Sequence, residues 1–404
     1  MPRPTDALHR LRRPFTAAIL AAAVALPAWC WAVADPPRPE QELLAAIDNL
    51  RSGDSGAALK NLEDLVKREP NFRLAQLLYG QVLAERSGVA PATPLVDISD
   101  PRVRDLLDEY RVRVAEAEKT PPPDALPSPI LKLSARHRYA IVADLPRSRV
   151  YVLQNVAGTL HRIGDYYATI ARNGFGKRNA GDLRTPVGVY RVTGFTPGGR
   201  LPPFYGAGAY PLDYPNAWDR AHGRTGSGIW LHGVPQTTYS RPPHASEGCV
   251  VLANSDLIAL RSMIVPGATP VVLSDRVDWL SPAQLELERN ALLHDIEDWR
   301  QKWSRLDTDA YLDYYDDNFH SDDGMGKPAF AAYKRRVNQG RRRIEVRLSD
   351  IDLFSYPGEP NVVLAEFTQL YRSDNYSSTS HKEQYWRRGP DGAWKILREE
   401  SRDL

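Results

Sequence analysis

Cys249 and His232 are the residues of this sequence whose types and spacing best suit covalent chemistry. A cysteine attacks as its thiolate, so it needs a base that removes its proton or holds it in an ion pair. Histidine can do this near neutral pH. His232 follows the apolar run Ile229–Leu231, which predicts a strand that would hold the imidazole rigidly. The two residues are 17 positions apart, with a loop expected between them.

Gly233 and Gly248 stand at the two ends of this loop. Gly233 leaves a backbone carbonyl accessible, which can orient the histidine ring through its second nitrogen. A Gly-Cys pair in a tight turn can aim successive N–H groups at a developing oxyanion. The alternative is structural: His232 caps a strand and Cys249 is a small buried hydrophobe. The glycines favour the catalytic interpretation, as does the expected removal of Cys30, which leaves a single thiol.

These residues resemble the L,D-transpeptidases of the YkuD type. The family signature is a strand ending in His-Gly, a loop, then Ser/Thr-His-Gly-Cys and a downstream Asn. It is matched here by His232-Gly233, Ser246, Gly248-Cys249 and Asn254. Upstream, the Thr-Pro-x-Gly turn at Thr185–Gly188 is similar to the second marker of the family. The resemblance covers about residues 138–275.

The resemblance implies a reaction and a set of roles. The cysteine would attack the carbonyl on the L-centre of a diamino acid in a peptidoglycan tetrapeptide stem, expel the terminal D-alanine and pass the thioester to an amine. The expected catalytic residues are Cys249 as nucleophile, His232 as general base and acid, the Gly233 carbonyl as its orienting group, and the N–H groups of Gly248 and Cys249 as oxyanion hole. The expected substrate-binding residues are Ser246, Glu247, Asn254 and His244. Neither a metal nor an organic cofactor is implied.

Two positions depart from the family pattern. Glu247 stands where these enzymes usually carry a second histidine, and a carboxylate near a thiol raises the thiol pKa. Glu247 therefore either points away or binds an acceptor amine. His244 could compensate for the missing histidine, or it is a solvated loop residue. Val251 replaces an arginine that many members carry. These changes leave the acceptor open: another stem, a protein or water.

The elements that position these residues are predicted to form a mostly β domain over residues 137–276. Short β-branched runs between glycine and proline turns predict strands at Tyr139–Ala143, Arg149–Leu153, Tyr166–Ile170, Gly188–Val192, Ile229–Leu231 and Thr269–Leu273. One helix is expected at Ser255–Met263, behind the cysteine.

Helical and mixed segments are predicted on both sides of this domain. Residues 35–87 resemble a tetratricopeptide-like hairpin of two helices, and residues 88–136 a proline-rich linker with one short helix. Residues 283–404 are similar to the nuclear-transport-factor-two-like fold, with helices at Pro282–Arg305 and Tyr311–Phe319 before a run of strands. The predicted fold class is multidomain: an α-helical N-terminal segment, a mostly β YkuD-like catalytic domain and an α+β C-terminal domain. The flanking parts are expected to bind substrate or an envelope protein.

The composition is that of soluble globular domains, with 42% hydrophobic and 25% charged residues among 404. The net charge of +2 comes from residues 1–34, so nothing indicates a nucleic-acid partner. In that segment a basic stretch precedes the apolar run Phe15–Trp31, and Ala32 and Ala34 form a cleavage pattern. We expect a signal peptide and a periplasmic location, with an uncleaved membrane anchor as the alternative.

Two charged clusters have weaker interpretations. Asp316, Asp317, His320, Asp322 and Asp323 could bind a metal, but their spacing fits no known site. The basic stretch 334–343 is expected on a solvated helix and strand, or in contact with anionic envelope polymers. The rival functions are a thiol hydrolase (carboxypeptidase or amidase) acting on stem peptides, and a catalytically dead wall-binding scaffold.

Overall fold

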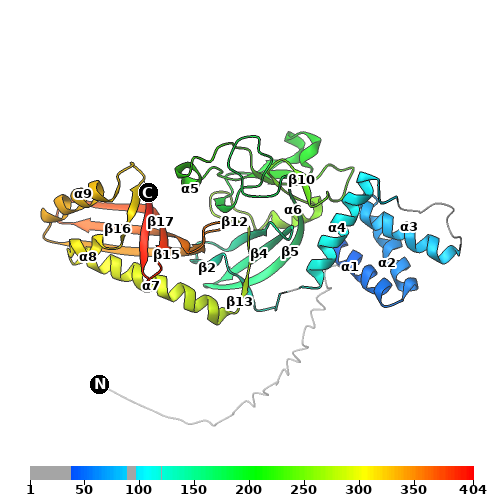
Figure 1. Ribbon diagram of the computed structural model, residues 1–404, viewed down its shortest axis with the longest axis horizontal. Coiled ribbons are helices and arrows are strands. Elements are labelled where there is room, and N and C mark those ends of the chain that lie inside the picture. Colours follow the sequence, from blue (N-terminus) through cyan, green and yellow to red (C-terminus); the bar gives the residue numbers. More distant parts are fainter. Residues whose placement is uncertain (1–37, 89–96, 120) are drawn as a thin grey trace, which may run out of the picture. The chain divides into compact units, whose positions relative to one another are not determined.

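A computed structural model describes residues 38–88, 97–119 and 121–404 of the chain (Figure 1). The expected signal peptide, residues 1–34, lies outside the described residues. Within the described ranges, no helix combines the length and the apolar character needed to cross a membrane. N-terminal helices lead into a β-rich domain and then into an α+β domain, which confirms the predicted fold class.

Three helices occupy the region predicted as a two-helix hairpin, so that prediction is wrong in number. They are α1 (Pro39–Arg51), α2 (Ser55–Arg68) and α3 (Arg73–Ser87), and α4 (Pro101–Ala117) follows. Asp54 separates α1 from α2, and its side chain accepts the Ala57 N–H at 2.9 Å and caps α2. Leu50 and Leu59 are separated by the turn-forming run Ser52–Gly56, and a second break around Pro70 separates α2 from α3.

The β-rich domain is built on a mixed sheet with strand order β6-β12-β3-β4-β5-β11-β9-β8-β7, and β10 pairs with β5. The strands are β3 (Tyr139–Asp144), β4 (Arg149–Val156), β5 (Thr159–Ala171), β6 (Gly188–Arg191), β7 (Thr196–Pro197), β8 (Gly208–Pro211), β9 (Trp230–His232), β10 (His244–Ser246), β11 (Val250–Leu252) and β12 (Pro270–Ser274). The helical elements are η1 (Gly198–Arg200), η2 (Pro203–Tyr205), α5 (Ala217–Ala221) and α6 (Asn254–Leu260). The predicted strands correspond to β3, β4, β5, β6, β9 and β12, and the predicted helix to α6.

Both faces of this sheet are buried, as β3 shows. Ile141 and Ala143 belong to the core of the β-rich domain, while Ala140 and Val142 belong to a second core shared with the α+β domain. Successive side chains of a strand point to opposite faces, so an uninterrupted apolar run is what a strand between two cores requires. The sheet that carries the predicted site is therefore supported from behind by the C-terminal domain.

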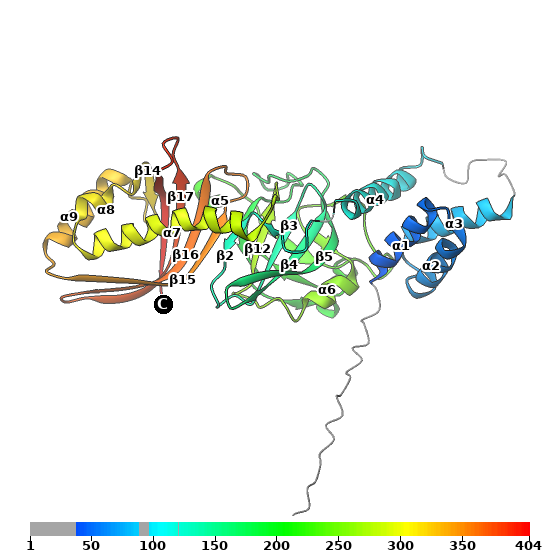
Figure 2. The same cartoon turned by 90° about the horizontal axis from the view of Figure 1, so that it is seen from below.

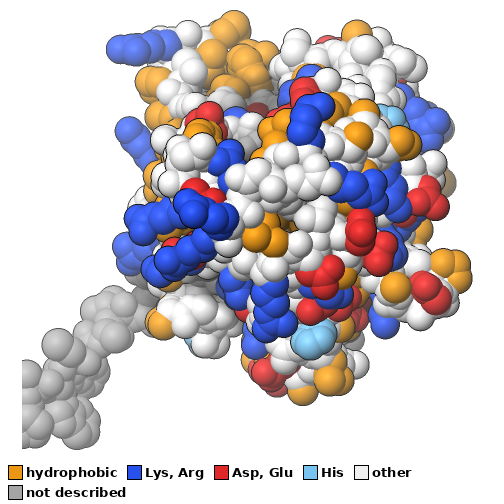
Figure 3. All heavy atoms as spheres, turned by 90° about the vertical axis from the view of Figure 1, so that its left-hand side faces the viewer, with side chains coloured by type: hydrophobic (Ala, Val, Ile, Leu, Met, Phe, Trp, Pro, Cys, Tyr) orange, Lys and Arg blue, Asp and Glu red, His pale blue; other side chains and the backbone are white. Residues whose placement is uncertain are grey.

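The α+β domain packs three helices against a second sheet with strand order β14-β18-β17-β16-β15-β2. Its elements are α7 (Pro282–Ser304), α8 (Thr308–Leu312), β14 (Tyr315–Ser321), α9 (Lys327–Gln339), β15 (Ile344–Ser355), β16 (Val362–Ser373), β17 (Ser377–Arg388) and β18 (Trp394–Asp403). Helix α7 runs along one face of this sheet (Figure 2). Exposed basic side chains gather at the end that carries α9, among them Arg335, Arg336, Arg342 and Arg343 (Figure 3).

The helix predicted at Tyr311–Phe319 is wrong in its second half. α8 ends at Leu312, and Tyr315 and Phe319 both lie in strand β14, fully buried in the aromatic core. Their separation of four residues places two side chains on one face of either a helix or a strand, so the pattern could not distinguish them.

The proline-rich segment predicted as a linker contributes two short strands at the domain junction. β1 (Leu126–Pro127) pairs with β13 (Trp279–Leu280), and β2 (Ile130–Lys132) adds an edge strand to β15. Just beyond β2, Arg136 donates to the buried Asp352 carboxylate at 2.7 Å. This segment therefore joins the two domains by hydrogen bonds and ion pairs.

Candidate active site

Two neighbouring parallel strands in the interior of the sheet bring the backbones of Cys249 and His232 close together. In the register of β11 and β9, Val250 pairs with Leu231 and Val251 with His232. Cys249 immediately precedes β11, so its backbone lies beside Trp230. The loop of the sequence signature is thus a crossover between adjacent strands, and Val251 is buried within the sheet.

The His232 imidazole is buried and has a defined tautomer. Its Nδ1 lies 2.7 Å from the Gly233 carbonyl oxygen, and because that oxygen can only accept, Nδ1 carries the proton and Nε2 is left as the basic nitrogen. The rings of Tyr205 and Phe204 lie 4.9 and 5.8 Å from the imidazole. Burial lowers the His232 pKa to about 4, opposed by the Gly233 hydrogen bond and reinforced by the Arg241 charge. The ring is neutral at pH 7.

The Cys249 thiol is partly exposed and protonated at rest. Its Sγ–H donates to the Gly228 carbonyl at 3.4 Å. Burial raises the Cys249 pKa to about 11, although the Trp230 backbone N–H and the Arg241 charge act in the opposite direction. Neutral thiol and neutral imidazole are therefore the resting forms, so an attack through this pair needs base catalysis at the moment of bond formation.

The turn before Cys249 is held by Ser246. Its hydroxyl donates to the Cys249 carbonyl at 2.6 Å and accepts the Gly248 N–H at 3.2 Å. Gly248 has φ +145°, and a Cβ there would lie 2.8 Å from Ile229 Cδ1, so the turn needs glycine. Of the two amides expected at the oxyanion hole, that of Gly248 already has an acceptor. Ser246 is buried and shapes the nucleophile turn.

Glu247 and His244 lie on the outer side of this turn. Glu247 is exposed and pairs with Arg172 at 3.3 Å, which agrees with the alternative that its carboxylate points away. His244 is exposed in β10, with Nδ1 3.4 Å from the Ala171 carbonyl. Within the described residues, neither side chain hydrogen-bonds the thiol or the imidazole.

Asn254 binds the backbone of two segments, the one that follows the histidine and the one that precedes β8. Its Oδ1 accepts the N–H groups of Ala207 and Val234 at 2.8 and 3.2 Å, and its Nδ2 donates to the Val234 carbonyl at 2.8 Å. A Cβ at Gly233 or at Gly206 would lie 2.2 Å from Oδ1, so both glycines permit this close approach. The amide of Asn254 is occupied by the protein itself, and it positions the His-Gly segment against the loop that carries the aromatic rings.

Three residues beside the histidine carry no signal in the sequence: Arg241, Phe204 and Tyr205. Arg241 lies in the loop between β9 and β10, with its Cζ 3.9 Å from the Phe204 ring centroid. Phe204 and Tyr205 form the short helix η2 (Pro203–Tyr205). No periodicity or motif marks these loop positions, and only the folded chain brings them to His232.

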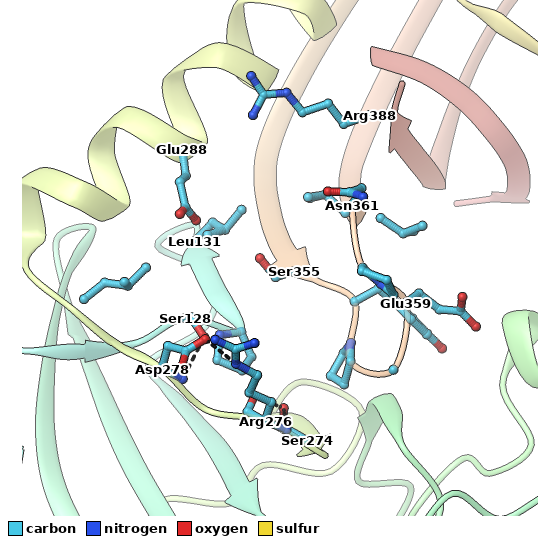
Figure 4. Close-up of a pocket in the computed structure, with 18 of the residues that line it drawn as sticks. Ser128, Leu131, Ser274, Arg276, Asp278, Glu288, Ser355, Glu359, Asn361 and Arg388 are labelled. Atoms are coloured by element: carbon cyan, nitrogen blue, oxygen red, sulfur yellow. Dashed lines mark hydrogen bonds and ion pairs between the residues drawn. The ribbon is translucent and has the colours of Figure 1, made fainter. Parts of the chain in front are cut away.

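A hollow of about 730 Å³ lies elsewhere, between the β-rich and the α+β domains (Figure 4). Arg276 follows β12, Glu288 projects from α7, and Asn361 and Arg388 face them from the other side. None of the predicted site residues lines this hollow. The hollow is therefore separate from the candidate active site at Cys249.

A buried cluster of metal-ligating type lies at the domain junction, at His137, Asp352 and Glu366. The Asp352 carboxylate lies 3.0 Å from His137 Nε2 and also accepts from Arg136. Arg191 donates to Glu366. Two guanidinium groups balance the two carboxylates, so the cluster is an ion-pair network that joins the domains.

The acidic cluster predicted from residues 316–323 does not converge on one point. Asp316 pairs with Arg387 from β17, and Asp317 with Lys327 at the start of α9, at 2.7 Å. These carboxylates serve separate ion pairs of the α+β domain.

Comparison with known proteins identifies the two C-terminal domains of the chain. Residues 138–273 match the family model of the L,D-transpeptidase catalytic domain (YkuD), and residues 291–400 match that of the Cds6 C-terminal NTF2-like domain. The chain therefore carries a YkuD catalytic domain, the domain of a family that acts on peptidoglycan, followed by an NTF2-like domain.

Two solved structures share most of this architecture. Bd1075 of Bdellovibrio bacteriovorus is 29% identical, with a TM-score of 0.61 over 70% of this chain and 99% of that one. The helical cell shape determining protein Pgp2 of Campylobacter jejuni is 26% identical, with a TM-score of 0.58 over 67% of this chain and 94% of that one. A sequence comparison with curated proteins gave no match.

Proposed function

We propose that this chain is a peptidoglycan L,D-transpeptidase, which forms a thioester between Cys249 and a tetrapeptide stem and transfers the stem to an amine. The observation that carries the proposal is the arrangement of Cys249 and His232 on adjacent parallel strands of a YkuD domain. The imidazole is neutral, and its Nδ1 proton is held by the Gly233 carbonyl, so Nε2 is available as a base. The solved structure of Pgp2, a helical cell shape determining protein, supports a role in shaping the wall.

The acylation step follows from this arrangement. Sγ attacks the carbonyl carbon on the L-centre of the diamino acid while its proton passes to Nε2 of His232. The tetrahedral intermediate then loses its C–N bond, and the imidazolium gives the proton to the amine of the departing D-alanine. A thioester remains on Cys249. An acceptor amine attacks it, His232 takes a proton from that amine, and the proton returns to the sulfur as the product leaves.

The resting pKa values of about 4 for His232 and about 11 for Cys249 decide the timing of the first proton transfer. A thiolate–imidazolium pair formed in advance would oppose both values, so the proton moves as the carbon–sulfur bond forms. The Cys249 amide would donate to the developing oxyanion, because the Gly248 amide is engaged by Ser246.

Tetrapeptide muropeptides and mass spectrometry test the proposal directly. The mature protein should release D-alanine and yield crosslinked or exchanged stems, and Cys249→Ala should yield neither. His232→Gln should also be inactive, whereas His222→Gln is the matched control, because the His222 Nδ1 likewise lies 2.8 Å from a carbonyl, that of Trp218. Shortened stems without transfer would assign the hydrolase, and no product and no thioester on Cys249 would assign the scaffold.

The location and partners of the chain belong to the same proposal. We propose that it acts in the periplasm, on peptidoglycan stem peptides, because residues 1–34 have the pattern of a signal peptide. The helical and NTF2-like parts would hold the substrate or an envelope protein. Cell fractionation of the full chain, with N-terminal sequencing of the mature form, tests the export; an uncleaved chain in the membrane fraction would assign an anchor instead.

A further inference from the structure

Arg241 is a half-buried cation without a carboxylate partner. Throughout the described part of the chain, no Asp or Glu oxygen lies within ion-pair distance of its guanidinium, whereas the buried Arg113 and Arg149 each contact two carboxylates. Its one hydrogen bond among these residues is a long one, 3.4 Å from Nη2 to the Phe204 carbonyl. Burial lowers the pKa of the Arg241 guanidinium, as expected of a cation that loses water without gaining an anion.

The position of Arg241 is nevertheless fixed. Its carbonyl oxygen accepts from the Tyr167 hydroxyl at 2.8 Å and from the Thr169 hydroxyl at 3.1 Å. The Tyr167 ring is itself covered by the Arg113 guanidinium, whose Cζ lies 3.9 Å from the ring centroid. Helix α4 thus supports the loop between the base and the nucleophile from behind. These contacts fix the Arg241 backbone, and the Phe204 ring under the guanidinium limits the positions that the side chain can take before a ligand arrives.

The Arg241 guanidinium and the His232 imidazole both lie near the Phe204 ring. The Arg241 Cζ lies over the Phe204 ring, and the Phe204 ring lies 5.8 Å from the His232 ring, so cation, phenyl and imidazole follow one another across the site. The positive charge acts on both reacting groups, lowering the pKa of Cys249 and that of His232. An unpaired, partly desolvated guanidinium beside a nucleophile is suited to an anion that the substrate brings, and its planar fork fits a carboxylate.

We propose that Arg241 forms a carboxylate subsite, which binds the C-terminal carboxylate of the donor peptide. This inference rests on the proposed function, in which the attacked carbonyl is followed by one terminal residue. The carboxylate of that residue is close to the scissile bond, and it leaves with the amine when the thioester forms. Arg241 would therefore restrict donors to peptides that end one residue beyond the attacked carbonyl.

Binding to the unreactive protein tests the subsite without turnover. Full-length Cys249→Ala protein is titrated calorimetrically with the stem tetrapeptide and with the same peptide carrying a C-terminal amide. We expect the free carboxylate to bind about 10- to 100-fold more tightly, the range typical of charge-assisted hydrogen bonds. A second substitution in the Cys249→Ala protein tests the role of Arg241. Arg241→Gln should abolish the preference for the free carboxylate, and Arg241→Lys should retain part of it.

Arg261→Gln is the matched control. Arg261 also lies over a phenylalanine ring, 5.1 Å from the Phe195 centroid, in the same domain and without an ion pair among the described residues. This variant should keep the full carboxylate preference. Thermal unfolding of each variant shows whether it is folded. Equal affinity for acid and amide in the parent, or an undiminished preference in Arg241→Gln, would overturn the subsite.

The outcomes separate this inference from the proposed function. If the wild type turns over tetrapeptides but acid and amide bind equally well, the transpeptidase proposal is supported and the carboxylate subsite is refuted. If the carboxylate preference depends on Arg241 but the wild type forms neither a thioester nor products, the subsite is supported and the transferase function is refuted.

Discussion

The N-terminal helices are held to the catalytic domain by a buried ionic contact centred on Glu40. Its carboxylate accepts from Arg113 at 2.6 Å and from Arg149 of β4 at 2.7 Å, and all three side chains are almost fully buried. Burial by itself raises the Glu40 pKa, but the two guanidinium groups outweigh it and hold that pKa at about 2. Replacement by the isosteric glutamine should therefore destabilise the docked helices.

The size of the effect follows from the pKa. A decrease from 4.5 to about 2 corresponds to about 3 kcal/mol, at about 1.4 kcal/mol per unit. This agrees with the cost of about 3–5 kcal/mol for removing one partner of a buried pair. Since 1.4 kcal/mol is a factor of ten, Glu40→Gln should make the backbone amides of α1–α4 exchange with solvent about 100-fold faster. The strands β15–β18 should exchange unchanged.

Hydrogen–deuterium exchange read by mass spectrometry measures this, with Glu63→Gln as control. Glu63 pairs with Lys67 at 2.6 Å on the exposed side of α2, and surface pairs contribute about 0–1 kcal/mol. Unchanged exchange in Glu40→Gln, or equal acceleration in both variants, would refute the reasoning.

The pH dependence supplies a second check. Because the folded-state pKa of Glu40 is below the unfolded value, its contribution is present above about pH 4.5 and disappears as the pH falls towards 2. Protection of the wild-type helices, corrected for intrinsic exchange, should decrease over that window. Glu40→Gln should lack this component.

Three further outcomes are expected at the site. Asn254→Ala should lower the free energy of unfolding by about 1–3 kcal/mol, because it releases the backbone around His232. For the same reason it should lower kcat far more than it raises KM. Urea unfolding and peptide turnover measure these effects, and an unchanged kcat would contradict the prediction. Ser246→Ala should lower the free energy of unfolding in urea by about 1 kcal/mol and slow the acylation of Cys249, because the turn before Cys249 loses two hydrogen bonds. Acylation at the wild-type rate would show that the turn keeps its shape without the Ser246 hydroxyl. Alkylation of Cys249 by iodoacetamide should accelerate about tenfold per pH unit from pH 7 to 9, since the thiol pKa is about 11; a plateau near neutrality would instead indicate a thiolate held by His232.

Much of the architecture could be predicted because its signals are local. The strands of the β-rich domain and the long helix α7 have hydrophobic patterns that a window of ten to twenty residues contains. The failures were also local. Turns at Asp54 and Pro70 divide the N-terminal segment into three helices instead of two, and the four-residue spacing of Tyr315 and Phe319 fits a helix as well as a strand. The C-terminal domain decided the second case by burying both rings in one core.

The sequence by itself determined the YkuD domain and most of its strands, because hydrophobic pattern and motif spacing are contained in the chain. It also supplied Cys249 and His232 as the predicted nucleophile and base. Only the tertiary structure decided what surrounds the pair. The backbone contacts of Asn254, the unpaired charge of Arg241 and the support from α4 all join segments far apart in sequence. Such contacts depend on packing between elements, and the residue pattern of a single element does not indicate which distant segments it will contact. The domain family was therefore readable from the chain, whereas the surroundings of Arg241, on which the proposed carboxylate subsite rests, became visible only in the fold.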